Sequence, residues 1–227
     1  MPTALLFDFD GTLVDSIELI LTSARFAFED YDGRPPTDDE WRASIGRPLI
    51  DAFRDFVPDE GEVHRLAARY REFQMVHHDR LLRAYDGVVD VIRSLATAGH
   101  PMALVTSKPD LLAQRGLEVI GLEDVIPVVV GCDSCTRHKP HPEPVERALV
   151  LLGATANDAI FIGDSPHDVS SGRAAGVFTV GVTWGAFSAD AMRGSGAEVV
   201  IENIRELPGV VKTVRGADHP AAQGPRR

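Results

Sequence analysis

Short apolar runs recur along the chain and are typical of buried β-strands. They lie at residues 3–9, 102–106, 125–130, 159–162, 177–182 and 197–201. Between them, apolar residues recur at helical spacing over 87–98, 109–119, 142–152 and 166–175. Strands that alternate with helices in this way predict an α/β fold, a Rossmann-like parallel sheet covered by helices on both faces.

The stretch after the first strand has a different pattern, because it holds no strand-like run before about residue 100. Apolar spacing fits a helix from Asp15 to about Tyr31, and the segment Asp32-Gly33-Arg34-Pro35-Pro36 ends it. Thr37-Asp38-Asp39-Glu40 is typical of a capping box that opens a short helix. Further helices are predicted over about 47–56 and 60–82, so we expect an all-helical cap domain inserted into the core.

These patterns divide the chain into three parts. Residues 1–15 and 83–211 are predicted to form the α/β core, and residues 16–82 the helical cap. Residues 212–227 contain Pro, Gly, Gln and terminal arginines, so a poorly ordered tail is expected there.

The composition of the chain excludes some classes of partner. The chain has 227 residues and a formal net charge of −11, which argues against nucleic acid or an anionic membrane surface as a partner. No segment approaches the length of a membrane span and no signal region opens the chain, so a cytoplasmic protein is expected, as a monomer or small homo-oligomer. An anionic substrate would then need local positive groups or a metal ion.

Two carboxylates stand where the first strand ends. Asp8 and Asp10 are followed at once by Gly11-Thr12. Ligands of α/β folds bind at the carboxyl ends of the strands. Two acids that close repel each other unless a cation, a proton or hydrogen bonds stabilise them, and Mg²⁺ suits such oxygen ligands. The alternative is an ordinary helix start, with Asp15 or Ser16 as its cap and the earlier acids incidental.

Four further polar residues follow predicted strands or precede helices. Thr106 ends one strand, Lys139 precedes the helix at 142, and Asp164 and Asp168 follow the strand at 159–162. Alone, Thr106 is typical of a helix cap and Lys139 of a solvated surface lysine. The chain has only three lysines, however, which favours a function for Lys139.

Taken in order, these positions resemble the four motifs of the haloacid dehalogenase (HAD)-like phosphatases, over about residues 3–205: D-x-D, a Thr or Ser after a strand, a Lys before a helix, and G-D-x-x-x-D. The resemblance implies that Asp8 attacks phosphorus to form an aspartyl-phosphate. Asp10 would act as general acid and then base. Thr106 and Lys139 would bind the phosphoryl group.

The resemblance also implies a magnesium site. Its ligands would be the carboxylates of Asp8 and Asp164 and the backbone carbonyl of Asp10. Asp168 would either bind the metal directly or orient a water bound to it.

Substrate contacts are expected around these groups. Gly11, Thr12 and Ser107 are assigned to substrate binding, and Lys108 is left open between a substrate contact and solvent exposure. In the cap, the segment Ser44-Ile45-Gly46-Arg47-Pro48 resembles the loop that HAD caps send to the active site. Arg47 would bind an anionic leaving group; the alternative is a surface arginine.

The resemblance is greatest to phosphoglycolate phosphatases and HAD pyrophosphatases, which predicts a Mg²⁺-dependent phosphatase for a small anionic phosphate. The cap contains no lysine, which excludes phosphonoacetaldehyde hydrolases, and Asp10 argues against haloacid dehalogenases themselves. A β-phosphoglucomutase-type phosphosugar mutase remains an alternative, as does a non-catalytic binding module. A zinc site at Cys132 and Cys135 is disfavoured, because their spacing matches no common zinc pattern.

Overall fold

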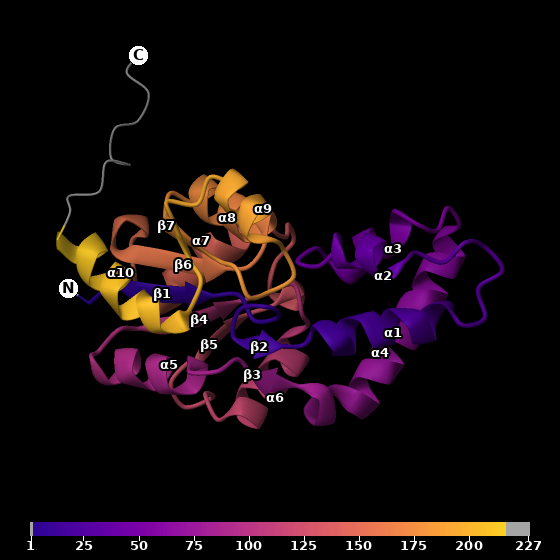
Figure 1. The fold of residues 1–227 in the computed structure, drawn as a ribbon, viewed down its shortest axis with the longest axis horizontal. Coiled ribbons are helices and arrows are strands. Elements are labelled where there is room, and N and C mark those ends of the chain that lie inside the picture. Colours follow the sequence, from indigo (N-terminus) through magenta and orange to yellow (C-terminus); the bar gives the residue numbers. More distant parts are fainter. Residues whose placement is uncertain (1, 217–227) are drawn as a thin grey trace, which may run out of the picture.

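The computed structural model describes residues 2–216, and its centre is a six-stranded parallel sheet (Figure 1). The strands are β1 (Ala4–Phe7), β4 (Met102–Val105), β5 (Val128–Val130), β6 (Ala159–Gly163), β7 (Phe178–Val182) and β8 (Val199–Ile201). Their order is β5-β4-β1-β6-β7-β8, and every neighbouring pair is parallel. The predicted α/β fold is confirmed. The direction of winding reverses beside β1, which is where such sheets bind ligands.

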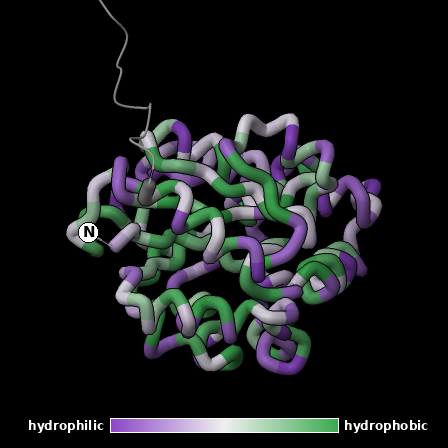
Figure 2. The backbone as a smooth tube through the Cα atoms, turned by 60° about the vertical axis from the view of Figure 1, so that its left-hand side comes forward, coloured by the Kyte–Doolittle hydropathy of each residue, from purple (hydrophilic) through white to green (hydrophobic). Residues whose placement is uncertain are grey.

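Helices cover both faces of this sheet, which explains the unbroken apolar runs of its strands. Along β1, Leu5 and Phe7 join the core on one face, whereas Ala4 and Leu6 join the core on the other. Side chains of α5 (Val88–Thr97), α6 (Asp110–Ile120) and α10 (Leu207–Gly216) belong to the first core, and those of α7 (Glu143–Leu152) to the second. Helix α8 (Pro166–Ala174) packs on β6 and β7. Figure 2 shows hydrophobic segments running through the centre of the molecule.

The cap is a separate helical unit beside the sheet (Figure 1). It contains α1 (Ile17–Phe28), α2 (Asp38–Arg42), α3 (Leu49–Arg54) and α4 (Glu60–Leu81), and α1 packs along α4. Its core is its own and is rich in aromatic residues: Phe28, Trp41, Phe53 and Tyr70 pack ring against ring. The capping box at Thr37 and Glu40 is present, as expected.

Three features differ from the sequence-based expectations. The chain enters and leaves the cap through a two-stranded antiparallel ribbon of β2 (Val14–Asp15) and β3 (Arg83–Ala84), which is too short to produce an apolar run. A short helix, α9 (Ala189–Gly194), was not predicted. Residues 212–216 of the expected tail belong to α10, because Val211 and Val214 pack against the core; the rest of that prediction, residues 217–227, lies outside the described residues.

Within residues 2–216, none of the helices combines the length and apolar character needed to cross a bilayer.

Candidate active site

The strand ends bring the predicted carboxylates to one edge of the sheet. Asp8 directly follows β1 and Asp164 directly follows β6, the neighbouring strand. The backbone N–H of Asp8 donates to the carbonyl of Ile162 at 2.9 Å, which extends the ladder up to the acid. Thr106 follows β4 on the other side of β1, and its N–H donates to Val130 O at 2.9 Å. The sequence therefore places these side chains together through strand register alone.

Three buried carboxylates cluster at this edge. Oxygen atoms of Asp8, Asp164 and Asp168 all lie within 4.8 Å of one another. Oδ2 of Asp164 accepts a hydrogen bond from the N–H of Ala186 at 2.6 Å. Among the described residues, Oδ1 of Asp164 is buried and has no hydrogen-bond partner. Buried polar atoms are rarely left unpaired, so this oxygen is available to a ligand such as a cation.

Lys139 is the positive centre of the cluster. It is buried, and its Nζ lies 2.9 Å from Oδ1 of Asp8 and 2.6 Å from Oδ1 of Asp168. The other oxygen of Asp168 accepts from the N–H and the hydroxyl of Ser165, at 3.0 and 2.6 Å, in the capping box that begins α8. Both oxygens of Asp168 therefore have donors from the protein. This arrangement fixes Lys139 beside Asp8.

The cluster carries more negative charge than Lys139 balances. Burial and the neighbouring Asp168 charge raise the pKa of Asp8 to about 7, although Lys139 opposes the shift. Burial and the charges of Asp8 and Asp168 also raise the pKa of Asp164 well above its usual range. Burial disfavours the charged form of Lys139, but Asp168 and Asp8 together raise its pKa. A site of this kind favours a bound cation or proton.

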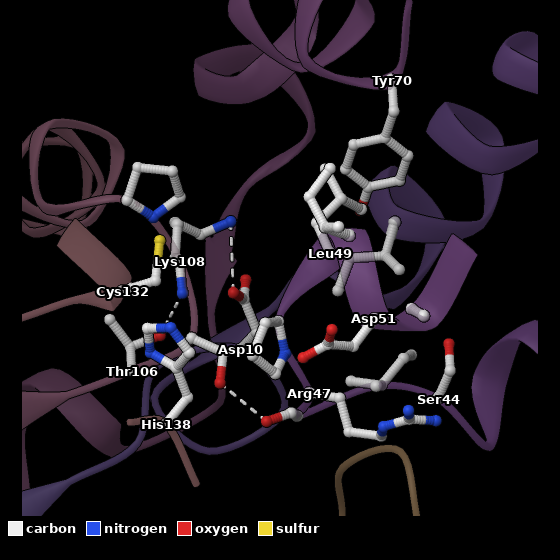
Figure 3. A pocket seen from close by; sticks show the side chains of 18 of the residues that line it. Asp10, Ser44, Arg47, Leu49, Asp51, Tyr70, Thr106, Lys108, Cys132 and His138 are labelled. Carbon is white, nitrogen blue, oxygen red and sulfur yellow. Dashed lines mark hydrogen bonds and ion pairs between the residues drawn. The ribbon is translucent and has the colours of Figure 1, made fainter. Parts of the chain in front are cut away.

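Asp10 lies beside the cluster and faces Lys108 (Figure 3). Oδ2 of Asp10 is 3.1 Å from Nζ of Lys108, and Oδ1 is buried without a hydrogen-bond partner among the described residues. Lys108 is only 6% exposed, which excludes the solvent-exposed alternative for this residue. Its backbone N–H donates to Oγ1 of Thr106 at 3.2 Å, so the same turn carries both side chains.

The segment after Asp10 approaches the cluster closely. Gly11 adopts a φ of +82°, and a Cβ at this position would collide with the carboxylate of Asp164. A Cβ at Gly185 would also collide with the side chain of Asp164 and with the carbonyl of Gly11. Thr12 is buried; its carbonyl accepts from Nε1 of Trp184 at 3.1 Å, while its hydroxyl has no partner among the described residues. These contacts hold the backbone against Asp164.

A cavity of about 360 Å³ separates this edge of the sheet from the cap. Asp8, Asp10 and Thr106 line it from the core, and the loop of residues 44–48 lines it from the cap. The hydroxyl of Ser107 donates to the carbonyl of Gly46 at 2.7 Å, which joins the two parts. The cap loop therefore reaches the site, as the sequence predicts. Arg47 lines the cavity as well, and its guanidinium forms an ion pair with Asp55.

Several residues at the site were missed by the sequence analysis. Ser165 holds Asp168, and the segment 184–186 contacts both Thr12 and Asp164. The position of residues 184–186 could have indicated these contacts, since they lie just beyond the predicted strand at 177–182, at the same edge of the sheet. Cys132 also lines the cavity, but burial raises the pKa of its thiol to about 12. The metal-ligand cluster found among the described residues is the three aspartates and includes neither cysteine.

Comparison with known proteins agrees with this geometry. The family model for haloacid dehalogenase-like hydrolases matches residues 5–182, and the chain belongs to this family, so the resemblance inferred from the motifs is confirmed. It is similar to the pyrophosphatase PpaX of Listeria monocytogenes serotype 4b, with 36% identity over 211 residues that cover 92% of this chain and 96% of that protein. The PpaX pyrophosphatase of Halalkalibacterium halodurans is also 36% identical, with coverages of 91% and 95%.

Solved structures share the fold. A protein described as a predicted phosphatase from Clostridium acetobutylicum superposes with a TM-score of 0.82 at 26% identity, covering 96% of this chain and 100% of the other. A protein described as a predicted phosphoglycolate phosphatase from Haemophilus somnus gives a TM-score of 0.84 at 22% identity, covering 92% and 97%.

Proposed function

We propose that the protein is a Mg²⁺-dependent phosphatase that hydrolyses a small anionic phosphate through an aspartyl-phosphate on Asp8. The observation that carries the proposal is the buried ion pair of Asp8 and Lys139, 2.9 Å apart. Asp8 lines the cavity, and so does Asp10, two residues further on. The PpaX relatives, which are named pyrophosphatases, support a phosphate substrate of small size.

In the first step, a carboxylate oxygen of Asp8 attacks phosphorus, and the bond from phosphorus to the leaving oxygen breaks. Among the described residues, Lys139 is the ion-pair partner of Asp8 and contacts Oδ1, so Oδ2 is the attacking oxygen. Asp10 gives its proton to the leaving oxygen. In the second step, Asp10 takes a proton from water, the water oxygen bonds to phosphorus, and the bond to Asp8 breaks. Two displacements replace one difficult displacement.

The aspartate cluster fits a magnesium ion, because it offers buried oxygen donors, one of them without a partner. The carboxylates of Asp8 and Asp164 and the carbonyl of Asp10 would hold the ion. Both oxygens of Asp168 already accept hydrogen bonds from the protein. Asp168 would therefore position Lys139 and a water on the ion rather than bind the ion directly. When bound, the ion neutralises negative charge so that a carboxylate can approach a phosphate.

The remaining roles concern the phosphoryl group and the cap. Thr106 and Lys139 bind the phosphoryl oxygens, and Gly11 and Thr12 supply the backbone turn that surrounds them. Ser107 contributes through the cap, since its hydroxyl contacts Gly46 in this structure.

The direct test is phosphate release from a panel of phosphate esters and anhydrides that includes pyrophosphate, phosphoglycolate and p-nitrophenyl phosphate. We expect the small anionic compounds to have the highest kcat/KM. Absence of release from every compound in the presence of Mg²⁺ would contradict the proposal.

For Asp10→Asn, we expect slow formation and slow breakdown of the phospho-enzyme, because one carboxyl serves as acid and then as base. General acid–base catalysis contributes about 10²–10⁴-fold. With p-nitrophenyl phosphate the first step should suffer less, since nitrophenolate leaves without a proton. Single-turnover measurements under conditions where phosphorylation limits the rate check this. Equal losses for alkyl and nitrophenyl esters would show that Asp10 is not the acid.

For Arg47→Ala, we expect a higher KM for pyrophosphate and phosphoglycolate and about a ten- to hundredfold lower kcat/KM, because a hydrogen bond to a charged group is lost. p-Nitrophenyl phosphate should be affected less. The matched control is Asp55→Asn, which removes the partner of Arg47 but keeps its charge, and which should not raise KM. If both variants lose activity equally on all substrates, Arg47 acts in cap structure rather than in substrate binding.

A further inference from the structure

Lys108 is a buried cation at the cavity for which the proposed mechanism has no role. It lines the cavity on the core side and is 6% exposed, and its Nζ lies 3.1 Å from Oδ2 of Asp10. Figure 3 shows its ammonium directed at the Asp10 carboxylate. Burying a lysine ammonium costs free energy unless opposite charges and hydrogen-bond acceptors surround it.

The ammonium has bonding capacity left over. A lysine Nζ carries three N–H donors. Among the described residues, Asp10 is its ion-pair partner and no other acceptor contacts it. On the other side of the pair, Oδ1 of Asp10 is buried and unpartnered. The remaining N–H groups of Lys108 and Oδ1 of Asp10 are therefore both available to a ligand in the cavity.

Three other cations near the site already have carboxylate partners. Lys139 contacts Asp8 and Asp168 within the aspartate cluster. In the cap wall of the cavity, Arg54 is paired with Asp51 and Glu60, and Arg47 is paired with Asp55. Both arginines have carboxylate partners that are themselves partly exposed, and no ion pair joins either arginine to Asp10 among the described residues. Lys108 alone of these cations is in contact with the residue that would protonate the leaving group.

We propose that Lys108 binds an anionic oxygen of the leaving group, immediately beside the oxygen that Asp10 protonates. The inference rests on the proposed function and makes its substrate class more specific. Because Lys108 and Asp10 are in contact, an anion held by Nζ must lie within a few bonds of the scissile bond. The preferred substrates are therefore compounds whose leaving group carries a phosphate or carboxylate next to the bridging oxygen, as in pyrophosphate and phosphoglycolate. Esters with a neutral or distant charged group bind less well.

A neutral analogue separates this role from simple positioning of Asp10. 2-Hydroxyethyl phosphate resembles phosphoglycolate in size and needs a proton at its leaving oxygen, but its leaving group has no charge. If Lys108 binds the anion, Lys108→Met lowers kcat/KM for phosphoglycolate about ten- to a hundredfold and lowers that for 2-hydroxyethyl phosphate much less. If Lys108 only orients Asp10, both substrates lose the same factor.

The experiment measures kcat/KM of the full chain with Mg²⁺ for these two esters and for p-nitrophenyl phosphate. Lys108→Arg keeps the charge and should recover part of the phosphoglycolate activity. Lys212→Met is the matched control, because Lys212 is exposed on α10, and it should behave as the parent protein. Thermal unfolding checks that each variant is folded.

The parent protein provides a second test that needs no variant. It should prefer phosphoglycolate over 2-hydroxyethyl phosphate at least about tenfold in kcat/KM. Equal values, or equal losses in Lys108→Met, overturn the role of Lys108 while leaving phosphatase activity in place. A parent protein that releases phosphate from none of the three esters overturns the proposed function, and this inference with it.

Discussion

Asp8→Asn loses turnover by about 10⁴-fold or more, because an amide cannot attack phosphorus and no other carboxylate occupies its position. Steady-state phosphate release on the best substrate of the panel measures the loss. Ordinary activity in a folded Asp8→Asn protein would exclude Asp8 as the nucleophile.

The same variant should be more stable than the parent protein in metal-free buffer at pH 8. Burial and the neighbouring Asp168 raise the pKa of Asp8 from its ordinary value of 3.8 to about 7 in the folded protein. Between these values the folded state binds a proton that the unfolded state has lost, so the stability of the parent falls as pH rises through this window. The variant lacks this penalty. Thermal unfolding at pH 8 and at pH 4 measures the difference, which should vanish at the lower pH; a less stable variant at pH 8 would contradict the charge balance described here.

Removal of Mg²⁺ by a chelator should lower activity about 10³-fold, since a bound ion supplies several kcal/mol of charge stabilisation. The same ion should raise Tm by about 5–10 °C at a concentration about 100 times its Kd. The rise should be larger at pH 8 than at pH 5, because protons compete for Asp8 and Asp164, whose pKa values are raised.

Ca²⁺ provides the control for this prediction. Its looser geometry and higher coordination number should allow it to raise Tm without restoring activity. Asp164→Asn should reduce the response of Tm to Mg²⁺. Full activity in metal-free buffer would remove the metal ion from the mechanism.

The sheet was predictable from the sequence because its strands are buried on both faces and read as unbroken apolar runs. The run at 159–162 corresponds to β6, Ala159–Gly163. The run at 125–130 is longer than β5, Val128–Val130, because Pro127 has no N–H to donate to the ladder, and Ile126 instead packs in the core. The ribbon of β2 and β3 was not predictable, since its two-residue strands are defined by pairing across the whole cap.

The clustering of the candidate site residues was predictable for a related reason: parallel strands end at a common edge, so polar residues after different strands meet there. The ion pairs at this edge were not. Lys108 contacts Asp10 rather than solvent, and its turn is held by the hydrogen bond from its N–H to Thr106. Ala186 contacts Asp164 from the loop after a different strand. Such contacts follow from tertiary packing and have no local pattern.

The central claim is that phosphate is carried by Asp8, and rapid quenching followed by peptide mass spectrometry tests it most directly. Asp10→Asn, in which breakdown of the intermediate is slowed, is mixed with Mg²⁺ and p-nitrophenyl phosphate, whose leaving group needs no proton for the first step, and is then quenched in acid and digested. The account predicts a phosphoryl group on Asp8, labile to hydroxylamine and absent from Asp8→Asn. Steady phosphate release with no phosphoryl group on Asp8 at any quench time, or a group on a different residue, would contradict it.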